Sequence, residues 1–383
     1  MFHLFGIARW RDSKEKSNPV DPANPVDGRV AKMDPLSPET SPILKELLPQ
    51  EMKDLFLSLG LRPFRVQQVL SWIYGHAALS FQEMTNISKT DRAFLDENAR
   101  IGHLEILGRE RAADGTEKWL LGLEDGLRIE TVLIPEEGHW TQCISTQVGC
   151  AMGCGFCRTG TMGLRRQLKA WEIAEQVVLA RRALEGGKVR NVVLMGMGEP
   201  LANYDAVVRA IRLMLLPGGL DLSKRRITLS TCGLVPEMKR FAAEGLGVNL
   251  AVSLNATTDE LRSRLMPINL RYPLKELLAA CRELPLPPRG RITFEYILFQ
   301  GVNDSSDGAR RLVRLLRGIR CKINLIPHNP FPGSPFARPS EQRILEFKVI
   351  LSEAHFTTPI RWSHGAEISA ACGQLAGGAP ESP

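Results

Sequence analysis

Along the second half of the chain, apolar runs of strand length alternate with amphipathic segments up to about residue 364. The predicted strands are NVVLMGMG, RITLSTCG, VNLAVSLN, ITFEYILF, KINLIPHN and TPIRWS. Between them, AWEIAEQVVLARRALE, YDAVVRAIRLMLL, VPEMKRFAAEG and SDGARRLVRLLRG repeat apolar residues at helical spacing. This alternation is typical of parallel β–α units, so we predict an α/β fold with an open or closed barrel. In such barrels the chemistry gathers at the carboxyl ends of the strands.

Two other patterns precede this region. Strict alternation over residues 104–147, with Asp114-Gly115 and Asp125-Gly126 at the turns, predicts β-hairpins. Residues 41–103 hold three helical segments, SPILKELLPQEMKDLFLSLGL, RPFRVQQVLSWIYGH and SKTDRAFLDENARIG, the last begun by a Ser or Thr cap. We therefore predict a flexible extension (1–40), a small helical accessory domain (41–103), a large α/β domain with its β extension (104–377) and a tail (378–383).

Composition narrows the class of protein. The 383 residues, 44% hydrophobic and 24% charged, are enough to bury a sizeable core. The net charge of +7 is compatible with a polyanionic partner without requiring one. The first residues read poorly as a signal peptide, and no apolar stretch approaches the roughly 18 residues of a membrane span. We expect a cytoplasmic protein, in which clustered cysteines indicate metal binding or catalysis.

The segment GCAMGCGFCRTGTMG brings Cys150, Cys154 and Cys157 close together. Structural zinc usually takes four ligands in two pairs, and the sequence offers no second CxxC or HxxxH pair. Three unliganded packing thiols at this spacing are uncommon in a cytoplasmic protein. An iron–sulfur cluster held by three thiolates leaves one iron open, and the glycines let the loop wrap around it. We favour the cluster over zinc or packing.

Several motifs in order resemble a known family. The CxxxCxxC loop, with Phe156 before its last cysteine, resembles the radical S-adenosylmethionine (SAM) superfamily. The further segments TQCISTQVGC, VVLMGMGEPLANYD, RRITLSTCGLVP, AVSLNATTDELRSRLMPIN, INLIPHNP and ISAACGQLAGG, with PFRVQQVLSWIY and FQEMTNIS before them, resemble the RlmN/Cfr family of radical-SAM RNA adenine methyltransferases. The resemblance covers roughly residues 45–377. It implies a partial (βα)6 barrel with a small N-terminal helical accessory domain and a β-hairpin extension.

The resemblance also implies cofactors and partners. A [4Fe-4S] cluster would be held by Cys150, Cys154 and Cys157, and two SAM molecules would be used per turnover. The SAM contacts implied are Gly198, Glu199, Ser230, Ser253, Leu254, Asn255 and Asn329. On pattern alone, a Ser or Asn at a strand end is more often a cap or turn residue than a ligand. The expected partners are RNA and an electron donor such as flavodoxin or ferredoxin, with the enzyme a monomer.

Three further residues carry the chemistry that the resemblance implies. Cys372 takes a methyl group from one SAM, and a radical made from the second SAM activates that methyl group for bonding to adenine. Cys143 then attacks the sulfur of Cys372, which forms a disulfide and frees the base. Glu130 removes the proton from the adenine carbon. On pattern alone, Glu130 is a polar strand residue and Cys372 a small hydrophobe. Packing roles are expected for Cys232, Cys281 and Cys321.

Several alternatives remain open at this point. We favour methylation of C2 of an adenosine in 23S rRNA, with some tRNAs as further substrates, over C8 methylation of the same base, which would confer antibiotic resistance. An iron–sulfur RNA-binding protein without turnover is a third reading. The chain departs from the family pattern at Asn255, at His328 and in HGAEI (His364–Ile368), which borders the substrate side. Basic residues that could meet phosphates are Arg158, Arg165, Arg166, Lys169, Lys224, Arg225 and Arg226.

Overall fold

The computed structural model describes residues 41–184, 188–287 and 289–378. The predicted flexible extension, residues 1–40, and all but the first residue of the predicted tail lie outside the described residues. All described residues belong to one unit, Leu36–Pro383. The four-part division of the chain remains a prediction.

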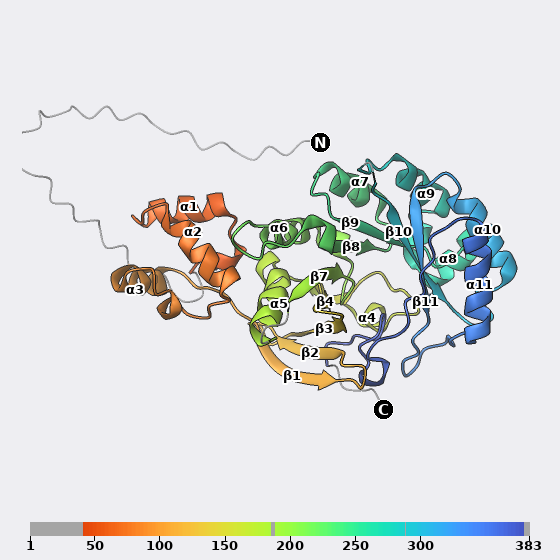
Figure 1. The fold of residues 1–383 in the computed structure, drawn as a ribbon, viewed down its shortest axis with the longest axis horizontal. Coiled ribbons are helices and arrows are strands. Elements are labelled where there is room, and N and C mark those ends of the chain that lie inside the picture. The colour runs from red at the N-terminus through yellow and green to blue at the C-terminus, as the bar shows by residue number, and fades with distance from the viewer. Residues whose placement is uncertain (1–40, 185–187, 288, 379–383) are drawn as a thin grey trace, which may run out of the picture. The chain divides into compact units, whose positions relative to one another are not determined.

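A nine-stranded sheet has the order β1-β2-β3-β4-β7-β8-β9-β10-β11. Its parallel strands are β4 (His139–Cys143), β7 (Val189–Leu194), β8 (Ile227–Thr231), β9 (Asn249–Ser253), β10 (Ile292–Leu298) and β11 (Cys321–Pro327). Its antiparallel strands, which continue from β4, are β1 (Glu105–Arg111), β2 (Glu117–Gly122) and β3 (Arg128–Glu136). The parallel strands confirm the predicted partial (βα)6 barrel, and the antiparallel strands confirm its β-hairpin extension (Figure 1).

Helices connect successive parallel strands. They are α5 (Ala170–Ala183), α6 (Tyr204–Met214), α7 (Val235–Ala243), α8 (Asp259–Leu265), α9 (Leu274–Glu283) and α10 (Ser306–Leu316), with α11 (Glu341–Glu353) after β11. Figure 1 shows α10 and α11 on the outer side of β10 and β11. The period of apolar residues explains this placement, because α10 buries Ala309, Leu312 and Leu316 on one face. The carboxyl ends of the strands are left for the loops that carry the motifs.

The accessory region is helical, as the sequence predicts. It contains α1 (Pro49–Ser58), α2 (Arg65–Leu70) continued by a π-helical turn (Ser71–Gly75), and α3 (Lys89–Asn98). The N-cap of α3 is confirmed, because the Ser88 hydroxyl accepts from the Asp91 N–H. The first predicted helix is wrong in extent: a 3₁₀ turn, Leu44–Glu46, precedes α1. Leu48 is extended because Pro49 follows it, and proline then begins the helix at its favoured first position.

One predicted strand is also wrong. TPIRWS forms a single parallel bridge, Leu325 to Ile360, rather than a strand. Leu325 donates to the carbonyl of Pro359 and accepts from the N–H of Arg361. Pro359 has no N–H that could donate a further ladder hydrogen bond to β11. Farther along the segment, the Ser363 hydroxyl donates to the side chain of Asn329. The predicted hairpin turns are confirmed, with Gly115 and Gly126 both at positive φ.

Candidate active site

Two short strands hold the cysteine loop at its base. β5 (Gln147–Cys150) pairs with β6 (Gly163–Gln167), so Cys150 ends a strand. Cys154 and Cys157 lie in the turn that follows. The hairpin requires glycine at position 149: its φ is +76°, and a Cβ there would lie 1.9 Å from the carbonyl oxygen of Gly163. The loop also returns close to itself at Gly160, where a Cβ would lie 3.1 Å from the backbone nitrogen and oxygen of Cys154.

The three thiols share one environment. Burial, with smaller contributions from the charges of Glu199 and Cys157, raises the pKa of Cys150 to about 11. Burial likewise raises the pKa of Cys154 well above its usual range, and both other thiolates add to that shift. Burial raises the pKa of Cys157, against hydrogen bonds from Gly160 and Thr159 that lower it. A cationic centre would reverse these shifts, because coordination deprotonates a thiol outright.

The donor set fits an iron–sulfur cluster better than zinc. In the described part of the chain, no three His, Cys, Asp or Glu side chains are arranged to hold one metal ion. Zinc would need such convergence on a single point. A cuboidal cluster instead binds each thiolate at a different iron, so its ligand sulfurs stay apart. Cys150, Cys154 and Cys157 are free thiols, which are soft ligands suited to iron, and they lie in one loop that is closed by glycine. They therefore fit such a cluster.

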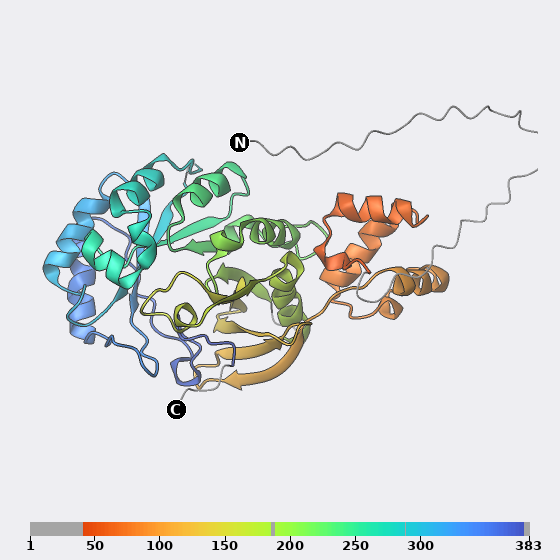
Figure 2. The same cartoon turned by 180° about the vertical axis from the view of Figure 1, so that it is seen from behind.

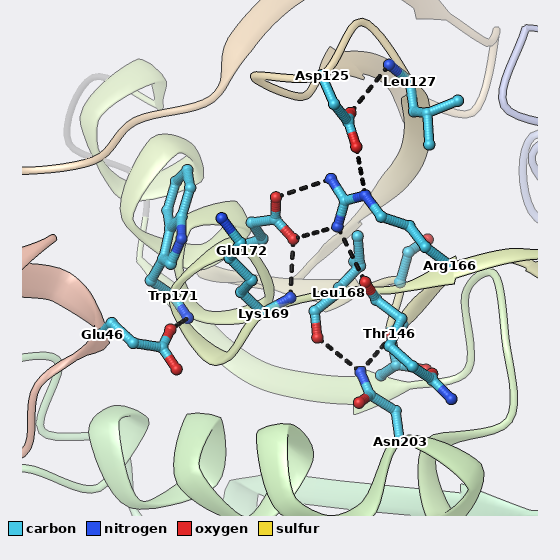
Figure 3. Close-up of polar contacts among 12 residues, drawn as sticks. Glu46, Asp125, Leu127, Thr146, Arg166, Leu168, Lys169, Trp171, Glu172 and Asn203 are labelled. Atoms are coloured by element: carbon cyan, nitrogen blue, oxygen red, sulfur yellow. Dashed lines mark hydrogen bonds and ion pairs between the residues drawn. The ribbon is translucent and has the colours of Figure 1, made fainter. Parts of the chain in front are cut away.

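An ion-pair network anchors β6, the strand that closes the cysteine loop. Arg166 donates from Nε to Asp125 in the β2–β3 turn at 2.5 Å. Its two terminal nitrogens donate to the buried Glu172 at the start of α5, at 2.8 and 2.9 Å (Figure 3). Asn203 adds hydrogen bonds to the carbonyls of Thr146 and Leu168 on either side of this hairpin. Arg166 is therefore committed to fixing the hairpin, which removes it from the residues that could meet phosphates.

Gly198 and Glu199 lie beside the cysteine loop. Gly198 has a φ of +103°, and a Cβ there would lie 2.6 Å from the side chain of Gln147. The amide oxygen of Gln147 accepts from the Glu199 N–H at 2.7 Å. The buried Glu199 carboxylate accepts from the N–H of Leu201 at 3.0 Å and from that of Cys232 at 2.7 Å. The carboxylate is thus held in place at the end of β7.

The other predicted SAM residues lie at neighbouring strand ends. Ser230 and Ser253 are partly exposed near the carboxyl ends of β8 and β9. Leu254 and Asn255 follow and are buried. Asn255 has a φ of +57°, and its Oδ1 accepts from the Ile297 N–H at 2.9 Å. The Asn255 side chain therefore fixes the loop after β9, a local role that its sequence position did not reveal.

The C-terminal segment carrying Cys372 docks against the cysteine loop, as Figure 2 shows. The Arg158 N–H donates to the carbonyl of Gly373 at 2.8 Å, and the Thr159 hydroxyl donates to that of Leu375 at 2.6 Å. From the loop after β11, the Asn329 amide donates to the carbonyl of Cys372 at 3.4 Å. The structure thus brings Asn329, Cys372 and the cysteine loop together from three distant parts of the sequence.

Glu130 holds the same segment from the other side. It is buried in β3, and its Oε2 accepts from the N–H groups of Ala376 at 2.7 Å and Gly377 at 3.1 Å. The Lys118 Nζ lies 3.6 Å from its other oxygen. Sequence reasoning gave Glu130 a role as a base and no contact with the C-terminal segment. In this structure the Glu130 carboxylate binds the backbone of that segment.

Cys372 lies close enough to Cys143 to influence its pKa. Burial raises the pKa of Cys143 above its usual range, and the neighbouring Cys372 raises it further. Desolvation by surrounding protein also raises the pKa of Cys372 to about 11, although the residue keeps exposed surface. Both cysteines are unpaired in this structure. At neutral pH each is a thiol, so thiolate chemistry at either residue requires a proton acceptor.

Known proteins match most of the chain. Residues 144–313 match the family model of the radical SAM superfamily, and residues 44–101 match that of the ribosomal RNA large subunit methyltransferase N-terminal domain. The dual-specificity RNA methyltransferase RlmN of Pelobacter propionicus is 55% identical over 334 residues, 87% of this chain and 95% of that protein. The RlmN of Syntrophobacter fumaroxidans is 51% identical over 333 residues, 87% of this chain and 97% of that protein. The chain belongs to the RlmN family.

A solved structure agrees with this assignment. The crystal structure of a radical SAM methyltransferase from Sphaerobacter thermophilus covers 88% of this chain and 99% of its own, with a TM-score of 0.84 and 46% identity. The chain is therefore a radical SAM RNA methyltransferase of the RlmN family. The superfamily implies a [4Fe-4S] cluster and SAM, and the cysteine loop described above fits the cluster.

Two residues at this RlmN-family site escaped the sequence analysis. Arg262 of α8 is fully buried, and its guanidinium donates to the carbonyls of Cys232, Ser253 and Leu254. Cys232, assigned to packing, lies beside Glu199, whose charge helps raise its pKa after burial. The only sequence signal for Arg262 was an arginine inside an amphipathic helix, which is ordinarily solvated. Packing burial of Cys281 and Cys321 is confirmed.

Proposed function

We propose that the chain methylates C2 of an adenosine in 23S rRNA, and that tRNA is a second substrate. The observation that carries the proposal is the position of the Cys372 segment, clamped between the cysteine loop and Glu130 beside Cys143. An RNA-binding protein without turnover would need neither of these two cysteines. The dual specificity in the names of the relatives supports the two RNA classes.

Each cofactor has residues suited to it. Cys150, Cys154 and Cys157 would hold the [4Fe-4S] cluster, and the SAM contacts would be Gly198, Glu199, Ser230, Ser253, Leu254, Asn255 and Asn329. When bound, the cluster and SAM supply a 5′-deoxyadenosyl radical. Two SAM molecules would be used per turnover, because one is needed to methylate Cys372 and another for the radical.

Cys372 is the carrier in this proposal. Its sulfur takes a methyl group from SAM, and that methyl group would then give up one hydrogen atom to the radical. The resulting carbon bonds to the adenine, so that protein and RNA are covalently joined, and the unpaired electron would pass back to the cluster. The Cys143 thiolate attacks the Cys372 sulfur, and the new S–S bond replaces the S–C bond. The released carbon keeps the bonding electron pair, takes up a proton and leaves with the base as its methyl group. Both thiols must be reduced again before the next turnover. The raised pKa of Cys143 keeps it protonated until a base accepts its proton.

Glu130 would accept the proton from the adenine carbon. Its carboxylate now bonds to Ala376 and Gly377, so the base becomes free when the segment carrying Cys372 shifts. The Lys118 Nζ lies 3.6 Å from the Glu130 Oε1 and faces the same carboxylate. Glu130 can therefore accept the proton only after it has released the segment that carries Cys372, the methyl carrier.

Cellular context completes the proposal. The cluster would be reduced by an electron donor such as flavodoxin or ferredoxin, and the enzyme would act as a cytoplasmic monomer. Of the helices in the described ranges, none combines the length and apolar character needed to cross a bilayer.

Mass spectrometry of nucleosides tests the function. RNA is incubated anaerobically with reconstituted enzyme, SAM and a reductant, then digested. We expect 2-methyladenosine from both 23S rRNA and tRNA. Product at C8 would replace the C2 assignment with the alternative activity, and absence of any methyladenosine would refute both.

Cysteine variants test the mechanism. Cys372→Ala should abolish product, because no sulfur remains to carry the methyl group. Cys143→Ala should accumulate protein covalently bound to RNA, visible as a shifted band on a denaturing gel. Cys321→Ala, at a buried cysteine of β11, is the matched control and should turn over. Normal turnover by Cys143→Ala would contradict the proposed release step.

A further inference from the structure

A basic cleft lies at the end of the barrel opposite the active site. Its volume is about 1190 Å³. It is lined by the first residue of β4, His139, by the start of β7 and by the segment that leads into β8. Its charged residues are Arg181, Lys188, Arg190, Arg225, Arg226 and Asp221. These are five cationic side chains and one carboxylate.

The positive charges of the cleft are largely uncompensated. Among the described residues, the side chains of Lys188, Arg190 and Arg225 have no hydrogen-bond or ion-pair partner. Arg181 interacts electrostatically with Asp221, and partial burial lowers its pKa. Arg226 donates only to the neutral amide of Asn191. Unpaired cations that line a concave surface focus a positive potential and attract anions.

The chemistry of the lining selects phosphate groups. A guanidinium group can donate two parallel N–H hydrogen bonds to the oxygens of one phosphate group. Apart from the imidazole of His139, the lining offers no aromatic ring on which a base could stack. The cleft is therefore suited to a phosphate backbone and not to the recognition of bases.

The position of the cleft requires a long ligand. Cys143, at the active-site end, closes the same strand that His139 opens, so about 13 Å of strand separates the two ends. One nucleotide at the catalytic cysteines cannot also fill the cleft. The cleft borders the accessory helices, because the neighbouring Arg182 donates to the carbonyl of Ala77 at 2.7 Å, and Gly218 lies against Gln67. That region matches the ribosomal RNA methyltransferase N-terminal domain.

We propose that this cleft binds the phosphate backbone of the RNA substrate at a second site, remote from the target adenosine. The proposal rests on the RNA methyltransferase function. The contact adds affinity for long RNA and is independent of base sequence. It also accounts for Arg225 and Arg226, basic residues that the catalytic site does not use.

The test compares two double variants of the full-length, reconstituted enzyme. Arg190→Ala/Arg225→Ala removes two exposed cations of the cleft. Lys275→Ala/Arg314→Ala removes two exposed cations from α9 and α10 and is the matched control. Binding of a long 23S rRNA fragment is measured by fluorescence anisotropy from 50 to 300 mM salt. A short hairpin that holds only the target adenosine and its neighbours is measured in parallel.

The cleft variant should bind the long fragment about tenfold more weakly near 0.1 M salt, and its plot of log affinity against log salt should be shallower by about 1.5 for two lost phosphate contacts. Its binding and methylation of the hairpin should match those of wild type. Equal binding of the long fragment by cleft and control variants would overturn the proposal. A defect seen only with an acidic electron-transfer protein as reductant would also overturn it and assign the cleft to that partner.

Failure of the underlying function gives a different result. If the wild-type enzyme methylates neither RNA, the proposed function is wrong, whatever the binding data show. If it methylates both and the cleft variant is unimpaired on the long fragment, only the second site is wrong.

Discussion

At the scale of single residues, His328 gives the clearest pH dependence. It follows β11, is 2% exposed, and its ring packs against Phe299 with centroids 5.0 Å apart. Burial lowers its pKa from 6.5 to about 4. Between these values the unfolded chain binds a proton that the folded chain does not, so stability falls as pH falls from 6.5 to 4. The full loss is about 3 kcal/mol.

His328→Phe should remove this part of the pH dependence, since an aromatic ring without a basic nitrogen fits among Phe299 and Phe336. Urea unfolding of the apo-protein at pH 7.5 and pH 4 measures the difference. Substitution of the exposed His103 by Gln serves as control and should leave the difference as in wild type. If His328→Phe loses as much stability on acidification as wild type, another group is responsible.

Single-residue predictions from sequence were strongest where chemistry limits the choice. A metal role could be predicted for Cys150, Cys154 and Cys157 because few other roles suit three cysteines at that spacing. The roles of Cys143 and Cys372 could be predicted only through the family resemblance. The hydrogen bonds accepted by the side chains of Asn255 and Glu199 could not be predicted, because their partners Ile297 and Cys232 lie more than 30 residues away in the sequence. Only the folded chain brings these backbone N–H groups to the side chains.

At the scale of elements, Arg262 ties α8 to the ends of β8 and β9. It donates to the carbonyls of Cys232, Ser253 and Leu254 and to the side chain of Asn269. Arg262→Leu should cost about 3 kcal/mol of stability, because buried acceptors lose their donors. SAM binding should weaken as well, since the predicted SAM segment loses its anchor. Thermal unfolding and SAM titration measure the two effects.

The exposed Arg310, which is paired with Asp307 on the surface of α10, is the control for this substitution. Arg310→Leu should change stability by less than about 1 kcal/mol and leave SAM affinity unchanged. An Arg262→Leu protein with wild-type melting and SAM affinity would contradict the anchoring role.

The Cys372 segment is the second element whose position can be tested. Glu130→Ala removes the acceptor of two N–H groups, so the segment should leave its docked position more often. We expect Cys372 to be alkylated about tenfold faster, from a loss of roughly 1.4 kcal/mol of docking free energy. Mass spectrometry after timed iodoacetamide treatment measures the rate. Glu117→Ala, at a residue of the neighbouring strand β2, is the control, and an unchanged rate in Glu130→Ala would show that other contacts hold the segment.

At the scale of the whole molecule, periodicity predicted β7 to β11 and the helices α5, α6, α7 and α10 in their order. It did not predict that β4 joins them as a parallel strand, nor the helices α8, α9 and α11. It could not distinguish TPIRWS from a strand, because pairing there is decided by the neighbouring Leu325 and by the missing N–H of Pro359. The contact between the C-terminal segment and the cysteine loop was likewise beyond pattern reading. It joins residues more than 200 positions apart through backbone groups that carry no sequence signal.

The accessory region is joined to the barrel by a buried ion pair. The Lys45 Nζ lies 2.5 Å from Glu175 Oε2 of α5, both side chains are fully buried, and burial raises the pKa of Glu175 to about 7. Tyr74 of the accessory region donates to the Lys45 carbonyl. Lys45→Met leaves the Glu175 carboxylate buried without its partner and should cost about 3–5 kcal/mol.

The double variant Lys45→Met/Glu175→Leu should recover most of that loss, because two apolar side chains avoid the desolvation of both charges. Denaturant unfolding of single and double variants gives the coupling energy. Lys239→Met, which breaks the exposed pair with Glu283, should cost less than about 1 kcal/mol. If the double variant is as unstable as Lys45→Met, the loss does not come from the unpaired carboxylate. The ion pair itself would then hold the accessory helices against the barrel. If the double variant recovers its stability, apolar packing is sufficient to hold the accessory helices on the barrel. The ion pair would then mainly favour this packing arrangement over alternative ones.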